Sequence, residues 1–165
     1  IRSGYMGYSM WGSDVGGYFS KSKIEEQSFL RWLEFAQWSG FMEVMLDNKE
    51  PWAYNPAFIA KYKSISEQRM ELIPYIYSIT NTAPTTGVMM KPLAYMYPDD
   101  PMTYPIFDVY LFGPSFLVAP MHSSNNSRSL YLPQGTWIDY YDRSREIAGG
   151  GVHTEENVPL DRIPV

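Results

Sequence analysis

The chain has 165 residues, of which 45% are hydrophobic and 19% are charged, and its formal net charge at pH 7 is -5. This balance is typical of a globular protein with a sizeable core and excludes a largely disordered chain. Nucleic acid is not an expected partner, because a phosphate-binding surface needs clustered cations and the densest basic stretch is Lys21 to Lys23.

The sequence contains no cysteine. Disulfides, thiolate nucleophiles and cysteine-ligated zinc are therefore excluded, and redox chemistry gives no indication of the compartment. The longest apolar run, Leu111 to Met121, is interrupted by Gly113 and Pro114 and is too short to span a bilayer, so no membrane partner is expected. No metal or cofactor is expected either, because no His, Asp or Glu pair has ligand spacing with an evident third partner.

The first half of the sequence begins with a predicted strand and a predicted helix. Met6 to Trp11 predicts a short strand, and the glycine-rich residues 12–17 predict the loop that follows it. Ser22 and Glu25 have the spacing of a capping box, so a helix is expected to start at Ser22. Apolar residues then recur at helical spacing, and Gly40 is the expected stop signal.

A second strand and a second helix complete this half. Phe41 to Leu46 is a mostly apolar run that is typical of a buried strand. A longer helix is expected from Pro56, which suits a first helical position, and Pro74 inside it predicts a kink or a new segment. This alternation is typical of a parallel sheet or a β/α barrel, and two such units are too few to close a barrel.

The sequence changes character near residue 85. The second half consists of short β-like runs separated by proline, glycine, aspartate and asparagine, which predicts antiparallel β-structure. These runs are Val88 to Tyr97, Val109 to Met121, Ser129 to Leu132 and Thr136 to Tyr141. The expected fold class is therefore α/β followed by all-β, with one unit in residues 1–85 and an incomplete second unit in residues 86–165.

Asp14 is the residue of the first half that points most clearly to chemistry. It lies between Trp11 and Tyr18, in a glycine-rich loop after a predicted strand. Loops at the carboxyl ends of barrel strands build active sites, and a carboxylate there accepts charge-assisted hydrogen bonds from sugar hydroxyls. The alternative is that Asp14 only stabilises a turn, which is a common role of aspartate.

A series of motifs runs in order along nearly the whole chain. It comprises Trp11-Gly12-Ser13-Asp14-Val15-Gly16-Gly17-Tyr18, Leu30-Arg31-Trp32, Glu50-Pro51-Trp52, Lys91-Pro92-Leu93, Tyr97-Pro98-Asp99-Asp100, Gly113 to Pro120 and Tyr131 to Trp137. In this order the motifs resemble glycoside hydrolase family 31. The resemblance implies the last β/α units of a TIM-type (β/α)8 barrel, followed by an antiparallel β-sandwich domain.

The resemblance also implies a retaining α-glycosidase acting on α-glucosides, α-xylosides or related sugars. In such enzymes two carboxylates about 5–5.5 Å apart act through an oxocarbenium-like transition state. The family's two catalytic aspartates belong to segments upstream of Trp11, so no catalytic residue is assigned to this chain, and the chain alone is expected to be inactive. The expected partners are an α-linked oligosaccharide or glycoside and the remainder of the barrel.

The resemblance assigns substrate binding to four residues, which are Trp11, Asp14, Tyr18 and Met45. Tyr18 stands where the family usually has a phenylalanine that lines the sugar subsite. After the Arg31-Trp32 motif, the family usually has an arginine and, two residues later, a histidine, whereas this sequence has Glu43 and Met45. An ionised glutamate cannot donate a hydrogen bond and methionine is only a weak acceptor, so the sugar specificity is left open.

Two further functions are compatible with the same sequence. One is a degenerate, non-catalytic carbohydrate-binding member of the family, which Glu43 and Met45 favour. The other is an interaction domain descended from the same barrel. The all-β half is expected to act mechanically, and Trp137, Tyr140 and Tyr141 belong either to its core or to an accessory sugar platform.

Overall fold

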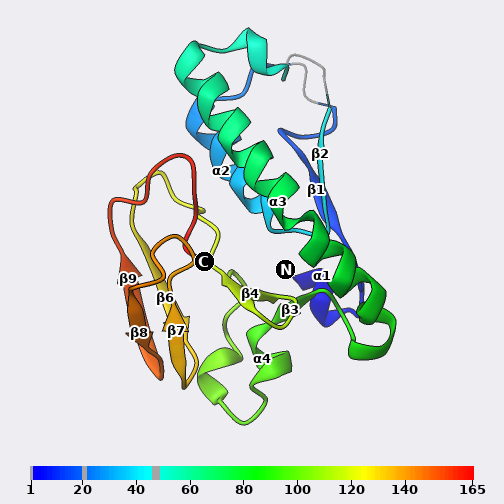
Figure 1. The fold of residues 1–165 in the computed structure, drawn as a ribbon, viewed down its shortest axis with the longest axis vertical. Helices are drawn as coiled ribbons and strands as arrows, with labels where there is room; N and C mark the ends of the chain where they lie inside the picture. The colour runs from blue at the N-terminus through cyan, green and yellow to red at the C-terminus, as the bar shows by residue number, and fades with distance from the viewer. Residues whose placement is uncertain (1, 20–21, 46–48) are drawn as a thin grey trace.

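The computed structural model describes residues 2–19, 22–45 and 49–165 of the chain (Figure 1). The first half contains α1 (Arg2–Tyr5), β1 (Gly12–Val15), α2 (Glu26–Gln37), β2 (Phe41–Val44) and α3 (Pro56–Thr86). The second half contains β3 (Met90–Pro92), α4 (Leu93–Met96), β4 (Tyr110–Phe112), β5 (Phe116–Val118), β6 (Arg128–Leu132), β7 (Thr136–Ile138), β8 (Glu146–Ala148) and β9 (Gly151–Glu155). Two short 3-10 helices, Pro51–Ala53 and Pro101–Thr103, complete the described elements.

The strands β1 and β2 form a parallel pair, as consecutive strands of a β/α barrel do. Gly12 pairs with Phe41 and Val15 with Val44. The helix α2 connects the two strands and contacts both of them as well as α3. Their shared core contains the buried residues Val15, Phe29, Leu30, Leu33, Ala36, Tyr54, Phe58 and Ile65.

The first strand lies later in the sequence than predicted. The prediction of a strand over Met6 to Trp11 is wrong, because β1 consists of residues that were expected to form a loop. Gly12 makes this pairing possible, since a Cβ atom at that position would lie 2.5 Å from the carbonyl oxygen of Phe41. The missing side chain of Gly12 therefore allows the two strands to approach closely. The glycine-rich sequence around it does not predict this role.

The predicted start of the first long helix is also wrong. The helix α2 begins at Glu26, and its N-cap is Glu25 instead of Ser22. The Glu25 carboxylate accepts hydrogen bonds from the backbone N–H groups of Gln27 at 2.9 Å and Ser28 at 2.8 Å. It thereby satisfies two of the N–H groups that a helix start leaves without intrahelical partners.

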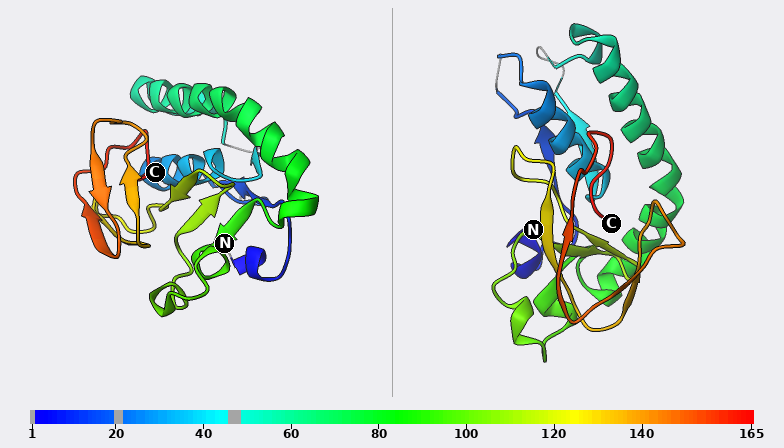
Figure 2. Two further views of the ribbon diagram at one scale, coloured as in Figure 1. Left: turned by 60° about the horizontal axis from the view of Figure 1, so that its bottom comes forward. Right: turned by 90° about the vertical axis from the view of Figure 1, so that its left-hand side faces the viewer.

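The helix α3 is a single element of 31 residues that continues through Pro74. Instead of the expected kink or new segment, Figure 2 shows a gradual curve. Pro74 and Met70 are both exposed, so the carbonyl that loses its helical N–H partner at the proline remains accessible to water. Within the described ranges, no helix combines the length and the hydropathy needed to cross a membrane.

The strand pairs described in the second half are antiparallel, as predicted. The strands β3, β4 and β5 form one sheet in that order, while β6 pairs with β9 and β7 with β8. The predicted β run from Val88 to Tyr97 is a strand only in β3, because α4 follows directly. Pro92 ends β3, where a proline cannot donate to a further ladder hydrogen bond.

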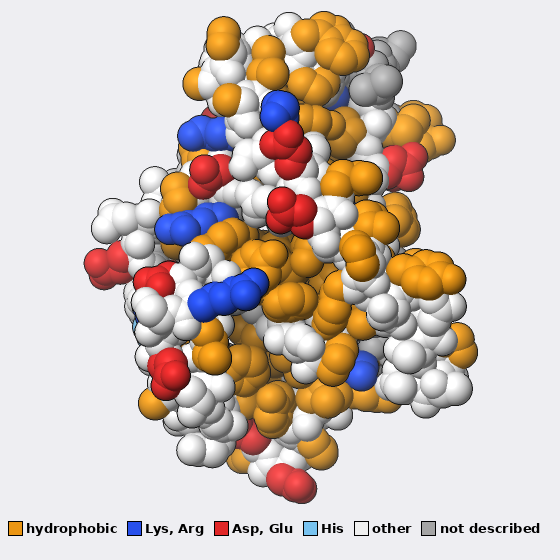
Figure 3. Space-filling model, viewed as in Figure 1, with side chains coloured by type: hydrophobic (Ala, Val, Ile, Leu, Met, Phe, Trp, Pro, Cys, Tyr) orange, Lys and Arg blue, Asp and Glu red, His pale blue; other side chains and the backbone are white. Residues whose placement is uncertain are grey.

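One hydrophobic core joins the two halves. Trp38, which follows α2, is completely buried, and its ring lies 5.1 Å from the ring of Phe116 and 5.1 Å from that of Tyr140. Ile76 of α3 and Phe112 of β4 belong to the same cluster. Figure 3 shows hydrophobic side chains gathered on the face where the two halves meet. The β half is therefore packed against α2 and α3.

Candidate functional site

The two faces of the β1–β2 pair have different surroundings. Val15 is completely buried, and Met42 and Val44 pack against the core that α2 shares with the sheet. Trp32 on α2 donates a hydrogen bond from Nε1 to the hydroxyl of Ser13 at 2.8 Å. These residues face α2, and because side chains alternate along a strand, the residues between them point to the opposite face.

The opposite face, called the open face below, carries Gly12 and Asp14 from β1 and Phe41 and Glu43 from β2. The parallel register places Asp14 directly beside Glu43. Phe41 is 43% exposed although it is hydrophobic. Glu43 is exposed as well, and Asp14 is partly exposed. The open face is therefore an accessible surface that combines two carboxylates with an aromatic ring.

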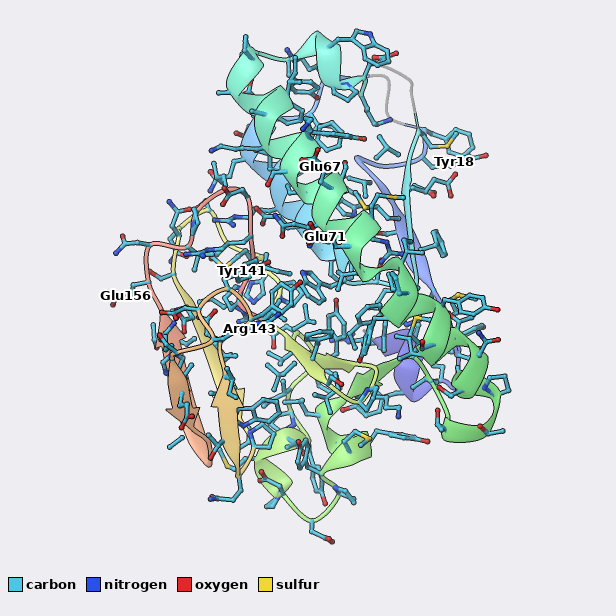
Figure 4. All side chains as sticks on the ribbon, in the orientation of Figure 1. Tyr18, Glu67, Glu71, Tyr141, Arg143 and Glu156 are labelled. Atoms are coloured by element: carbon cyan, nitrogen blue, oxygen red, sulfur yellow. The ribbon has the colours of Figure 1, made fainter. Side chains whose placement is uncertain are left out.

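The chain turns sharply at the carboxyl end of β1. Gly16 and Gly17 have φ angles of 86° and 82°, a region that glycine adopts without strain. The Gly17 N–H donates to the carbonyl of Asp14 at 2.8 Å. Beyond the turn, Tyr18 and Phe19 are 51% and 87% exposed, and their rings meet edge to face at 4.4 Å. Figure 4 shows Tyr18 projecting away from α2 and α3.

The structure brings two of the predicted sugar-binding residues together and separates a third. Asp14 and Tyr18 lie at the same end of the sheet. Trp11 packs against Phe35 of α2, with ring centroids 6.1 Å apart, and belongs to the core that joins the halves. Met45 follows β2 directly and is half-buried, and continuing the strand alternation puts it on the open face. Sugar binding by these residues stays a prediction.

Arg31, in the second motif, lies in a buried hydrogen-bond network. Its Nη1 is 3.0 Å from Oε2 of Glu34. The guanidinium also donates to three backbone carbonyls, those of Val158 (2.7 Å), Pro159 (2.8 Å) and Arg162 (3.1 Å). Burial raises the pKa of Glu34 to about 8, although Arg31 acts in the opposite direction. The pair connects α2 to the last residues of the β half.

The aromatic residues of the β half have packing partners. Trp137 donates from Nε1 to the carbonyl of Pro133 at 2.8 Å. The ring of Tyr140 lies edge-on to Trp38 and to Phe116, at 5.1 Å and 5.4 Å. Trp137 and Tyr140 line a cavity of about 520 Å³ together with other residues of the domain. Trp137 packs against the core of the β domain and Tyr140 against the core that joins the two halves, which favours packing roles over an accessory sugar platform.

The exposure of Phe41 and Glu43 and the burial of Arg69 are not predicted from the sequence. The run Phe41 to Leu46 is predicted to be a buried strand, but Phe41 and Glu43 are exposed, while Leu46 lies outside the described residues. The polar Glu43 inside this apolar run is the feature of the sequence that indicates alternating side chains, with one face of the strand exposed. Arg69 of α3 is also buried. Its helical spacing from Ile65 and Ile76 indicates that it lies on the buried face of α3.

The acidic and histidine side chains of the described residues do not gather into a metal-ligand cluster. Among the described residues, no three His, Asp or Glu side chains lie close enough together to hold a metal ion. The open face presents its carboxylates as a pair on neighbouring strands. Ionised carboxylates in this arrangement accept hydrogen bonds.

Two profiles of one protein family match the chain. "Glycosyl hydrolases family 31 TIM-barrel domain" matches residues 1–79, and "Glycosyl hydrolase family 31 C-terminal domain" matches residues 86–165. Alpha-glucosidase 2 of Bacillus thermoamyloliquefaciens is 30% identical over 100% of this chain and 21% of its own length. An alpha-xylosidase of Saccharolobus solfataricus is 31% identical over 96% of this chain and 23% of its own length.

A solved structure gives the same result at the level of the fold. The family 31 dextranase of Flavobacterium johnsoniae, complexed with isomaltotriose, superposes with a TM-score of 0.84 and 25% sequence identity. The alignment covers 98% of this chain and 21% of the dextranase. The fold is thus part of a TIM-type barrel domain joined to an antiparallel β domain, an architecture of carbohydrate-active enzymes.

The chain belongs to glycoside hydrolase family 31. It spans 21% and 23% of the length of the two curated relatives described above.

Proposed function

We propose that the chain is part of a retaining α-glycosidase and that the open face forms one wall of its sugar pocket. The placement of Asp14 is the observation that carries this proposal. Asp14 lies near the carboxyl end of a parallel strand, on the face turned away from the covering helix α2. In a closed barrel this face is the interior, and the loops at the carboxyl ends of the strands build the active site.

The proposed role of these side chains is to bind and orient the sugar. Asp14 accepts hydrogen bonds from sugar hydroxyls, and its charge makes these bonds stronger than neutral ones. The exposed ring of Tyr18 offers an aromatic surface for the C–H face of a pyranose, and its hydroxyl is a further donor. The nucleophile and the acid/base carboxylate are proposed to lie on parts of the protein outside this chain.

The two halves have separate proposed roles. We assign residues 1–85 to the barrel and residues 86–165 to the proximal β domain, a division supported by the end of α3 at Thr86 and by the antiparallel strands that follow. In the described residues β1 and β2 are paired with each other, which leaves the outer edge of each for a further barrel strand. The proposed partner of these edges is the remainder of the barrel.

Expression of the full-length protein tests the proposed activity. Nitrophenyl α-glucoside and α-xyloside are suitable probes, because alpha-glucosidase and alpha-xylosidase relatives match the chain. We expect hydrolysis of at least one probe, with the α-anomer as the first sugar product in NMR spectra. Release of the β-anomer, or no hydrolysis of any α-glycoside, would contradict the proposal.

Glu43 and Met45 favour a second candidate function, that of a degenerate member that binds α-linked sugars without cleaving them. Neither side chain replaces the hydrogen-bond donors that the family usually has at these positions. Titration of the full-length protein with maltose and isomaltose, followed by tryptophan fluorescence, separates the two functions. Saturable binding without turnover selects the degenerate member, whereas turnover of either sugar excludes it.

A further inference from the structure

Arg69 on α3 holds the end of α2 in place. Its guanidinium donates to three backbone carbonyls, those of Gln37 (2.7 Å), Ser39 (2.7 Å) and Gly40 (3.2 Å). Burial lowers the pKa of Arg69 to about 10, so the side chain is still charged at neutral pH. The positive charge lies at the negative end of the helix dipole. A planar guanidinium reaches several carbonyls at once, which a compact ammonium does not.

Tyr110 on β4 binds the carbonyl of this segment that lies between those held by Arg69. Its ring is completely buried, and its hydroxyl donates to the carbonyl of Trp38 at 2.8 Å. Four consecutive carbonyls, those of residues 37–40, are therefore fixed by side chains from two other elements. The next residue, Phe41, is the first residue of β2.

The same segment is coupled to the strand that carries Asp14. The Gly40 N–H donates to the carbonyl of Trp11, the residue before β1, at 3.1 Å. The approach is close, because a Cβ atom at Gly40 would lie 2.8 Å from that carbonyl oxygen. A displacement of the α2–β2 turn would therefore move β2 relative to β1 and change where Glu43 lies beside Asp14.

We propose that Arg69 and Tyr110 are positioning residues for sugar recognition. They fix the carbonyls of residues 37–40, directly before β2, and thereby set the place of Glu43 on the open face. This inference rests on the proposed function of that face. It gives the β half, through Tyr110, a direct part in sugar selectivity in addition to its mechanical role.

The test compares Tyr110→Phe with the matched control Tyr75→Phe in the full-length protein. Tyr75 on α3 also donates its hydroxyl to a backbone carbonyl at 2.8 Å, but its acceptor is Phe112 of β4 and lies outside the α2–β2 turn. Each variant removes one phenolic hydroxyl from one carbonyl, and Tyr75→Phe also removes an acceptor of the Ser115 N–H at 3.3 Å, so the control is at least as disruptive. If both tyrosines were merely structural, the two variants would have the same sugar selectivity.

The first readout is the ratio of kcat/KM for the α-glucoside to kcat/KM for the α-xyloside. Because both values come from the same sample, the ratio does not depend on how much of the enzyme is folded. Since small displacements of binding groups have large kinetic effects, we expect Tyr110→Phe and Arg69→Lys to change the ratio by about tenfold. Tyr75→Phe should leave it unchanged.

The second readout is amide hydrogen exchange in β2, which needs no substrate. We expect faster exchange of the β2 amides in Tyr110→Phe than in Tyr75→Phe. Equal exchange in the two variants would overturn the inference, and so would an active Tyr110→Phe enzyme with an unchanged ratio. A wild-type protein that neither cleaves nor binds α-glycosides would instead overturn the proposed function itself.

Discussion

Asp14 and Glu43 are register partners on the neighbouring parallel strands β1 and β2, and their side chains emerge on the same face. Two like charges directly opposite each other in a sheet are destabilising. The fold nevertheless presents both of them on the face that α2 leaves open. We therefore interpret the pair as a feature of the binding surface with a small cost in stability.

Relieving this repulsion should stabilise the protein. Glu43→Gln removes one of the two charges, and we expect the free energy of unfolding to rise by about 0.5 kcal/mol at low salt. The gain should shrink in 0.5 M salt, because exposed charges are screened. Urea unfolding at both salt concentrations measures this. Glu71→Gln on the exposed surface of α3 is the control, and a loss of stability in Glu43→Gln alone would contradict the prediction.

Arg31 should be among the most sensitive positions for stability. Above pH 8, where the Glu34 carboxyl ionises in the folded chain, Arg31→Met leaves a buried carboxylate without its cationic partner, which costs about 3–5 kcal/mol. Adding Glu34→Gln to this variant removes the uncompensated charge and should restore part of the loss. The urea midpoints of the wild type and of the single and double variants measure the effect. A double variant that is less stable than Arg31→Met would show that Glu34 is not the source of the cost.

Glu34 should make the stability depend on pH. Its pKa is raised by burial from the model-compound value of 4.5 to about 8 in the folded chain, so the folded state retains a proton that the unfolded state releases. Its contribution to stability is therefore complete below about pH 4.5 and is lost as the pH rises through about 8. We expect Glu34→Gln to unfold with a weaker pH dependence between these values. Parallel curves for variant and wild type would contradict this assignment.

The turn after Asp14 should not tolerate a side chain at Gly16. A Cβ atom there would lie 2.5 Å from Cδ1 of Ile24 and 2.7 Å from Cδ of Lys49, and the φ angle is 86°. Gly7→Ala is a matched control, since Gly7 has a φ angle of 82° and no atom within 4 Å of its Cβ position. We expect Gly16→Ala to lower the thermal midpoint more than Gly7→Ala. Equal losses would mean that backbone strain alone accounts for the effect.

The sequence predicts the fold of this chain better than it predicts the details of the site. Strand and helix alternation, the parallel pair and the antiparallel second half follow from residue periodicity and turn residues. The position of β1 does not follow from these signals. Gly12 and Gly16 are both typical of a loop, but Gly12 lies in β1 and only Gly16 lies in a turn. The start of α2 is mispredicted for a similar reason. The local sequence is compatible with either Ser22 or Glu25 as the N-cap, and the structure has Glu25.

The surroundings of individual side chains depend on contacts that are distant in sequence. Trp11 lies three residues before Asp14 in the motif but packs against Phe35 of α2, because side chains an odd number of residues apart along an extended chain point to opposite faces. Arg69 is about 30 residues from the carbonyls that it holds. Such pairings become visible only when α3 and the end of α2 are placed side by side.

The most direct test of the proposed sugar wall is a crystal structure of the full-length protein with bound isomaltose. We expect a sugar ring over the open face, with one hydroxyl about 2.6–3.2 Å from the carboxylate of Asp14 and the ring of Tyr18 beside it. Isomaltose bound elsewhere, with the Asp14 carboxylate turned away from it, would show that the open face is not a sugar-binding wall.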